Sequence, residues 1–522
     1  MFPLFLFRKS KKEKPMKKKI LSAILAALML SSTALMTACS NNSAEENSGE
    51  TTQQNTASDV TVTPEETDVS TDDLSDYEQR QLIPDNLPDV KYNGADYRVL
   101  THSSDEYYQE IMADELTGDA CNDAVFNRNL DVEERFDVKL SVDQEDYPYN
   151  MPKTMAQAGT LDYHLIGFYD YHSYTPITAE ALLNWYEVPN VDLTKPWYNQ
   201  LANDDATVNN RLYSVCSDLS LTSMTYTYSI FANIDLANNY GYTKDDLYAL
   251  VKEGKWTIDF LTSTIEGMYI DTNGNGSADI NDQYGMGCYP NNVADVWFNA
   301  FGGKVTGRDE EGNVTITFLD DKTVSMVEKL LALHYQNEGF YYITSAAYDE
   351  ETWFLNQQLV FAPLRFIAAF TTLRDMETSY TMLPFPKWDE AQKNYYTNAD
   401  DKFTVFGIAT PGYSEQEYIG TIFEALSAGA YKKVYPEYYD TALKGKYSTD
   451  STTAEMVELI MAGRMFDFSF QFGESVFVRI PYMIRDLIQS NNPDIASKYQ
   501  SVQKAMQKNM ERNFVKAYGL DE

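Results

Sequence analysis

From residue 92 onward, the apolar and polar positions follow two alternating periods. Runs typical of short strands occur at 97–100, 138–142 and 164–168. Apolar residues at helical spacing predict helices over 120–136, 244–252, 322–334, 416–431 and 453–462. Strands that alternate with helices indicate α/β units with mostly parallel sheets.

The helix predicted over 120–136 carries a single apolar stripe. Its members are Ala124, Val125, Leu130, Val132 and Phe136. A stripe of this kind faces the core of a domain, so these side chains are expected to be buried.

Two further segments, 221–236 and 403–409, are rich in β-branched and aromatic residues and poor in charges. Each is compatible with an ordinary core strand or with an extended crossing between two lobes. Their separation along the chain suits one lobe inserted into another. The pattern alone does not decide between these alternatives, and it contains no internal repeat.

The amino terminus has the pattern of a targeting segment. Eight of the 41 basic residues precede an apolar run at 20–30, which is too short to span a membrane and typical of a signal peptide. Small residues follow and end in Leu35-Met36-Thr37-Ala38-Cys39, which resembles a bacterial lipobox. We expect Cys39 to be lipidated. The alternative is an ordinary cleaved signal with an incidental cysteine, and Met16 is an alternative start, so translation of residues 1–15 is left open.

Residues 39–89 form a polar and acidic stretch in which Arg80 is the only basic residue. Such a composition buries too little apolar surface to offset the entropy lost on ordering, so a disordered linker is expected. A lipid anchor followed by this linker would hold the folded part near a membrane, outside the cytoplasm.

Composition excludes several classes of protein. The 522 residues carry a formal charge of −37, and no basic run follows the first 19 residues, so nucleic acid is not an expected partner. Four cysteines and four histidines are too few for a disulfide scaffold or a Cys/His zinc module. The sequence has no P-loop, no G-x-S-x-G and no H-E-x-x-H, so any ATPase partner is a separate chain.

Several stretches together resemble extracellular solute-binding proteins of Gram-positive bacteria. They are Glu115-Leu-Thr-Gly-Asp through Glu134, Gly254-Lys-Trp-Thr257, Leu383-Pro-Phe-Pro-Lys387, and Tyr435-Pro-Glu-Tyr-Tyr439 with Leu443-Lys444. Their order resembles the maltodextrin-binding type, family 1, which feeds oligosaccharides to an ATP-driven (ABC) importer. The resemblance covers roughly residues 90 to 520.

The resemblance implies a periplasmic-binding-protein-like α/β fold of class II, with two lobes joined by a hinge and a ligand cleft between them. The boundaries it suggests are 1–38 for the signal peptide, 39–89 for the linker, 90–230 with 401–440 for lobe 1, and 231–400 with 441–522 for lobe 2. The implied function is capture of a carbohydrate, an oligosaccharide above all, and its delivery to the permease subunits of an ABC importer. A monomer without catalytic activity is expected, lipid-anchored on the extracellular face of a Gram-positive cell membrane.

Alignment with the family places five residues at the cleft: Tyr169, Asp170, Trp297, Arg365 and Phe366. Aromatic rings offer flat apolar area to the C–H face of a sugar, while carboxylate and guanidinium groups pair with its hydroxyls. The alternative for each aromatic residue is an ordinary place in the core. Which sugar binds, and which aromatics line the cleft, are left open.

A separate pattern at 271–282 resembles a calcium loop of the dockerin variant. Oxygen-bearing candidate ligands are Asp271, Asn273, Asn275, Ser277, Asp279 and Asp282, with Gly276 at the tight turn. We expect a structural Ca²⁺ and no catalytic cofactor. The alternative is a polar Asn-Gly turn that needs no ion.

Two other functions remain open at this stage. One is a cell-surface glycoside hydrolase, which would use two carboxylates 5–9 Å apart, roughly. The acidic residues of this chain are too numerous to exclude such a pair from the sequence. The other is a sugar-sensing or scaffold lipoprotein.

Overall fold

The computed structural model describes residues 75–310, 312–344, 349–439, 443 and 451–520. The signal peptide, Cys39 and most of the predicted linker lie outside the described residues. Within the remainder of that linker, Ser75 caps a helix, α2 (Asp76–Leu82), through a capping box with Glu78. The expectation of disorder is therefore wrong for this part of 39–89. No described helix has the length and apolar character needed to cross a membrane.

The first sheet has the strand order β11-β3-β1-β2. Its strands are β1 (Ala95–His102), β2 (Val138–Glu145), β3 (Leu165–Tyr169) and β11 (Thr404–Gly407). β1 pairs in parallel with β2 and β3, whereas β11 runs antiparallel to β3. The strands predicted at 97–100, 138–142 and 164–168 are thus present.

The second sheet has the order β10-β4-β9-β5-β8. Its strands are β4 (Tyr228–Asn233), β5 (Tyr284–Cys288), β8 (Phe340–Tyr342), β9 (Leu359–Arg365) and β10 (Tyr380–Leu383). β5 is parallel to β8 and β9, but β4 is antiparallel to β9 and β10. Both sheets are therefore mixed: the first is mostly parallel, as expected, whereas the second is parallel only on the side of β5. β6 (Thr306–Arg308) and β7 (Val314–Ile316) form a separate hairpin.

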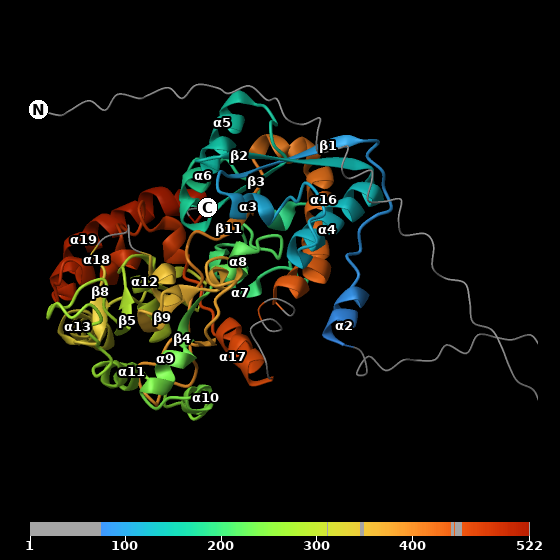
Figure 1. The fold of residues 1–522 in the computed structure, drawn as a ribbon. Coiled ribbons are helices and arrows are strands. Elements are labelled where there is room, and N and C mark those ends of the chain that lie inside the picture. Colours follow the sequence, from blue (N-terminus) through green and yellow to red (C-terminus); the bar gives the residue numbers. More distant parts are fainter. Residues whose placement is uncertain (1–74, 311, 345–348, 440–442, 444–450, 521–522) are drawn as a thin grey trace, which may run out of the picture. The chain divides into compact units, whose positions relative to one another are not determined.

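Helices cover both sheets (Figure 1). Around the first sheet lie α3 (Asp105–Gln109), α4 (Ala120–Phe136), α5 (Met151–Ala158), α6 (Tyr174–Thr178), α7 (Gln200–Ala206) and α16 (Gln416–Gly429). Those that follow the crossing to the second sheet are α9 (Ile234–Asn239), α10 (Lys244–Lys252), α11 (Ile258–Ile265), α12 (Asn292–Ala300), α13 (Asp321–Gln336), α14 (Glu350–Leu355) and α15 (Ile367–Phe370). The last described helices are α17 (Ser451–Ala462), α18 (Met483–Gln489), α19 (Ile495–Asn509) and α20 (Val515–Ala517). All five predicted helices are present.

Two extended segments carry the chain between the sheets. The first follows α8 (Thr222–Thr225) and leads into β4, and the second runs through 397–403 into β11. They lie side by side, because Tyr228 N donates to Asn398 O at 3.1 Å and Asp400 N donates to Tyr226 O at 3.0 Å. A third segment joins them where Met465 N donates to Thr397 O at 2.7 Å. The segments 221–236 and 403–409 are therefore crossings that end in strands, and the lobe boundaries proposed from the sequence remain predictions.

The buried face of α4 differs from the predicted stripe. Leu130 is 40% exposed, whereas Arg128 is fully buried. The Arg128 guanidinium donates to the carbonyl oxygens of Glu110, at 3.1 Å, and Ile111, at 2.5 Å. It thereby satisfies backbone acceptors at the end of α3 that no water can reach. A polar side chain can thus occupy a core position when it donates hydrogen bonds to buried carbonyl oxygens.

Replacing Arg128 with Leu should lower the free energy of unfolding by about 3 kcal/mol, because the buried Glu110 carbonyl would lose its donor and the Ile111 carbonyl would keep only the bond from Asn129. Leu130→Ala, on the same helix, should change it by less than about 0.5 kcal/mol. Urea unfolding followed by circular dichroism measures both. Equal losses in the two variants would contradict this account of the helix.

Candidate functional site

A cavity of about 1060 Å³ lies between elements of the two halves. Its wall on one side is α3 and the start of α4, and on the other it is the end of β9 with α15. The crossing segment at 221–226 forms part of the lining. β1 and β9 direct their carboxyl ends to this region, the edge at which α/β sheets ordinarily bind ligands.

The lining of this cavity is strongly acidic. Two arginines, Arg365 and Arg374, face the carboxylates of Asp105, Glu106, Glu110, Asp119, Glu351 and Glu437. Arg374 pairs with Asp119 across the cavity at 3.0 Å, joining the turn after α15 to the start of α4. Because both side chains of that pair are exposed, the contact contributes little and is easily broken by a ligand.

Arg365 connects the cavity to the crossing segments. Its guanidinium lies 4.3 Å from the centre of the Tyr226 ring and 3.5 Å from the Asp400 carboxylate. The Tyr226 hydroxyl donates in turn to Glu106, at 3.0 Å. Burial alone would raise the pKa of Asp400, but the positive charges of Arg365 and Lys402 hold this pKa below its usual value. A buried, ionised carboxylate thus fixes the Arg365 guanidinium at the wall of the large cavity.

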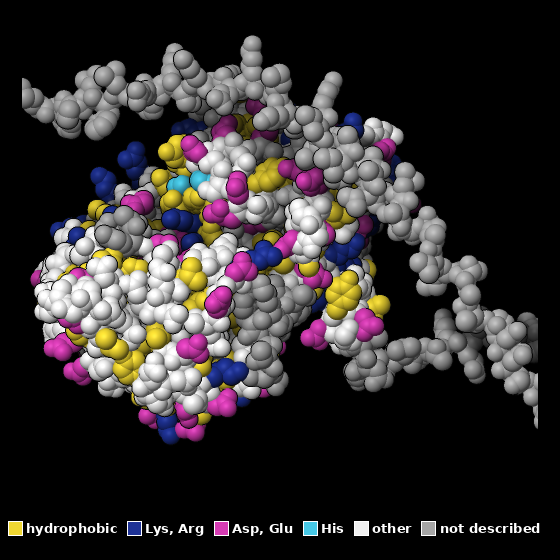
Figure 2. Space-filling view, viewed as in Figure 1, with side chains coloured by type: hydrophobic (Ala, Val, Ile, Leu, Met, Phe, Trp, Pro, Cys, Tyr) yellow, Lys and Arg dark blue, Asp and Glu magenta, His cyan; other side chains and the backbone are white. Residues whose placement is uncertain are grey.

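A group of half-buried aromatic rings continues from this point along the edge of the first sheet. We call it the aromatic array: His102, Tyr149, Tyr169, Tyr171 and His172. Tyr169 stacks on His102, with centroids 4.4 Å apart, and lies 5.7 Å from Tyr171 in a stacked arrangement. His172 lies 4.0 Å from Tyr171 and 3.9 Å from Tyr149. Figure 2 shows histidine side chains at the surface beside hydrophobic ones.

The array reaches the cavity through Tyr107, whose ring lies 5.0 Å from Tyr169 and 6.1 Å from Tyr226. Burial lowers the pKa of His172 to about 4, and the charge of His102 acts in the same direction. The His172 imidazole is therefore neutral at physiological pH. A run of uncharged rings beside charged and hydroxyl groups can receive a ligand that is apolar on one face and polar at its rim.

A second, much smaller cavity of about 40 Å³ involves the other crossing segment and the chain at 465–471. Asp170, directly after β3, lines it and accepts a hydrogen bond from Gln471 Nε2 at 2.7 Å. Burial raises the pKa of Asp170 to about 7, an increase that the bond from Gln471 limits.

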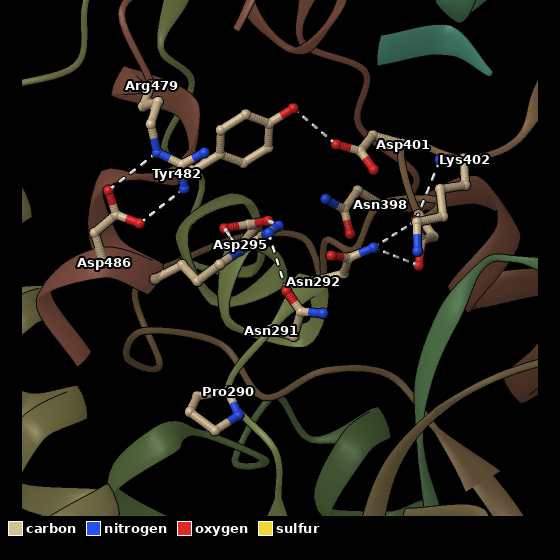
Figure 3. A network of polar contacts seen from close by, with 12 residues as sticks. Pro290, Asn291, Asn292, Asp295, Asn398, Asp401, Lys402, Arg479, Tyr482 and Asp486 are labelled. Atoms are coloured by element: carbon tan, nitrogen blue, oxygen red, sulfur yellow. Dashed lines mark hydrogen bonds and ion pairs between the residues drawn. The ribbon is translucent and has the colours of Figure 1, made fainter. Parts of the chain in front are cut away.

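Polar contacts surround this small cavity on the side of the second sheet (Figure 3). Arg485 forms an ion pair with Asp295 of α12, and Tyr482 donates to Asp401 at 3.0 Å. Burial raises the pKa of Asp401 to about 8, and the neighbouring charge of Asp400 adds to the increase. Residues from α12, the crossing segment and the C-terminal part are thereby held together.

The five site residues expected from the family alignment have different positions. Tyr169 lies in the aromatic array and Arg365 in the wall of the large cavity, whereas Asp170 points into the small one. Trp297 and Phe366 are fully buried in the core and offer no ring face to a ligand. For these two residues the core alternative is the one that the structure shows.

Sequence reasoning missed several residues that the structure brings to the same region. They are His102, Tyr149, Tyr171, His172, Tyr226 and Asp400. A signal was present for three of these: His102 ends β1, and Tyr171 and His172 follow β3 within three residues. Side chains at the carboxyl ends of parallel strands meet at one edge, so these positions were open to prediction.

The loop at 271–282 is described, and its polar side chains bond mainly within the loop. Backbone N–H groups donate to the Asp271 carboxylate at 2.7 and 2.8 Å, and the amides of Asn273 and Asn275 donate to Asp279. Ser277 N donates to Asn275 Oδ1 at 2.7 Å, and Asp282 is fully buried. The described residues contain no group of three or more His, Cys, Asp or Glu side chains placed to hold a metal ion.

No protein-family profile matches the chain, and no curated protein matches it in sequence. Its structure is similar to the GacH receptor of Streptomyces glaucescens, solved unliganded and with acarbose, at 12% identity and a TM-score of 0.52 over 80% of this chain and 99% of that one. The maltose/maltodextrin-binding domain MalE of Bdellovibrio bacteriovorus, bound to maltotriose, matches at 12% identity and 0.52 over 79% and 99%. A cyclo/maltodextrin-binding protein with maltotetraose matches at 13% identity and 0.51 over 80% and 98%.

These similarities confirm the fold that the sequence motifs implied. The chain has the two-lobed α/β architecture of maltodextrin-binding-type solute-binding proteins, with the cavities described above between elements of its two halves.

Proposed function

We propose that this chain, whose fold is that of a maltodextrin-binding-type solute-binding protein, captures a carbohydrate between its lobes and releases it unaltered. The observation that carries the proposal is the aromatic array, which leads from the edge of the first sheet toward the large acidic cavity. The structural neighbours support it, since their bound ligands are acarbose, maltotriose and maltotetraose.

The chemistry of the region suits a sugar. A pyranose presents C–H groups on its faces and hydroxyls at its rim. Ring faces of Tyr169 and Tyr171 can cover the C–H groups, while Arg365 can donate to the hydroxyls and Glu106 can accept from them. Because Arg365 is already held by its neighbours, little of its side-chain entropy remains to be lost on binding.

The extent of the array favours an oligosaccharide over a single sugar. Five rings are arranged in succession from Tyr149 to His102, so several sugar units can lie along them at once. The large cavity, of about 1060 Å³, has room for a ligand at the upper end of the usual range for small-molecule sites.

Truncation of Tyr169 tests the proposal. Tyr169→Ala should weaken binding of maltodextrin-type oligosaccharides about tenfold, because the loss of one stacking face is worth about 1–1.5 kcal/mol. Tyr413→Ala is the matched control, since Tyr413 is 67% exposed on a separate 3₁₀ helix. Isothermal titration of the purified protein measures both, and chromatography of the recovered sugar reports any cleavage.

Binding that is equally weakened in both variants, or unchanged in both, would remove the array from the site. Shortened oligosaccharides in the recovered fraction would contradict release of an unaltered ligand and favour the hydrolase alternative.

We also propose that the mature chain is lipid-anchored through Cys39 on the extracellular face of the membrane and delivers its ligand to the permease subunits of an ABC importer. The motif at 35–39 and the polar linker behind it support this placement. Cys39→Ala should move the protein from the membrane fraction to the medium when it is expressed in a Gram-positive host. Retention of that variant in the membrane fraction would contradict lipidation at this cysteine.

A structural Ca²⁺ in the loop at 271–282 is a separate proposal. It rests on the spacing of oxygen-bearing residues from Asp271 to Asp282. Ca²⁺ should raise the melting temperature of chelator-treated protein, and Asp271→Ala should abolish the increase. The control is Mg²⁺ at the same concentration, because Mg²⁺ requires a tighter octahedral site. No calorimetric heat with Ca²⁺ would rule the ion out.

A further inference from the structure

The small cavity of about 40 Å³ is lined by many acceptors of hydrogen bonds, two of which have no donor among the described residues. Six carboxylates line it: Asp170, Asp205, Asp295, Asp400, Asp401 and Asp467. A volume of this size holds a functional group or a few water molecules, but not a whole sugar ring. What enters it is therefore a single substituent of a larger ligand.

Only half of these carboxylates are balanced by a cation. Lys304 pairs with Asp205 at 2.7 Å, Arg365 with Asp400, and Arg485 with Asp295. The other three, Asp170, Asp401 and Asp467, form no ion pair with any described Lys or Arg. Asp170 accepts a hydrogen bond from Gln471 and Asp401 accepts one from Tyr482, while Asp467 accepts from backbone N–H groups and from the Thr306 hydroxyl.

Two buried amide oxygens at this cavity have no partner. They are Oε1 of Gln471, a residue 4% exposed, and Oδ1 of Asn398, a residue 8% exposed. Their orientation is set, since Gln471 Nε2 donates to Asp170 and Asn398 Nδ2 donates to Asn299 at 3.1 Å. A buried acceptor without a donor is unfavourable, so both oxygens point to a group that donates.

A hydrogen-bond donor matches these two oxygens better than a metal ion does. Nowhere in the described part of the chain do three or more His, Cys, Asp or Glu side chains converge as metal ligands do. A hydrogen-bond donor does not require several acceptors to converge on one point as a metal ion does, so it fits this cavity better. Among such donors, an ammonium group is favoured over a hydroxyl, because it donates up to three hydrogen bonds and can form an ion pair with Asp170, which has none among the described residues.

The lining of the large cavity also carries a net negative charge. Its lining carries six carboxylates against the two arginines. An anionic ligand would have to approach all of them, whereas a cationic one would be attracted from both cavities. Burial raises the pKa of Asp170 to about 7, which is the behaviour of a buried carboxyl that lacks a cation.

From these observations we propose that the ligand is an amine-bearing saccharide, whose ammonium group enters the small cavity against Asp170, Gln471 and Asn398. The proposal rests on the carbohydrate-binding function proposed above and narrows its substrate class. It excludes saccharides that carry carboxylate or phosphate groups.

Isothermal titration against three oligosaccharides of equal length provides the test: a glucosamine oligomer, an N-acetylglucosamine oligomer and a uronic acid oligomer. The amine-bearing oligomer should bind at least tenfold more tightly than the N-acetylated one, and the uronate should show no saturable heat. Raising the salt concentration should weaken only the amine-bearing oligomer, because screening acts on its charge.

Asp170→Asn should reduce the preference for the amine-bearing over the N-acetylated oligomer to less than threefold. The control is Asp235→Asn, in the exposed first turn of α9. Gln471→Met is a second variant with the same expected effect, and thermal melting checks that each variant is folded.

Equal affinity for the three oligomers, or a preference for the uronate, would overturn the amine-specific site and leave carbohydrate binding intact. If neither these oligomers nor maltodextrins bind, the proposed function itself fails, and the inference fails with it.

Discussion

The Asp400 carboxylate lies where the crossing segments meet both halves of the molecule. It accepts hydrogen bonds from Asn292 at the start of α12, at 2.8 Å, and from Tyr228 at the start of β4, at 3.1 Å, and it faces Arg365 at the end of β9. On the other side, the same segment binds the end of β3, because Asp170 N donates to Phe403 O at 3.0 Å. One charged residue thereby fixes β4, β9 and α12 relative to the strand that carries Tyr169 of the aromatic array.

The cost of such a buried charge explains the arrangement around it. An isolated carboxylate in this position would lose several kcal/mol of hydration, so it persists only with a cation and a full set of donors. Arg365 is that cation. The same ion pair holds the Arg365 guanidinium over the Tyr226 ring, in the wall of the large cavity. The pair of Arg365 and Asp400 therefore both stabilises the fold and positions a polar group at the cavity.

The sequence was sufficient for the order of elements, since helices and strands with clear periods were found where the pattern placed them. It was insufficient where tertiary contacts override the pattern. Arg128 is buried because carbonyls at the end of α3 need a donor, and no local signal reveals those carbonyls. β4 looks like any apolar strand, yet its antiparallel pairing is decided by the crossing that precedes it.

For the site, the alignment with the family assigned five residues to the cleft, but the structure places only Tyr169 and Arg365 beside the large cavity or the aromatic array, and Trp297 and Phe366 in the core. Size and aromatic character do not distinguish a ring that packs inside from one that lines a cleft. Position relative to a strand end is more informative: Tyr171 and His172 directly follow β3, whereas Trp297 lies within α12. Asp400 could not have been found in this way, because its role depends on three partners that are distant in sequence.

The separation of tryptophan from the aromatic array has a spectroscopic consequence. Five of the six indole rings, those of Trp185, Trp197, Trp256, Trp297 and Trp353, are buried, and none of the six belongs to the array. A ligand seated on the array would therefore leave the indole emission of the protein nearly unchanged. Its arrival would be visible instead in the near-ultraviolet absorption and dichroism of the phenol rings.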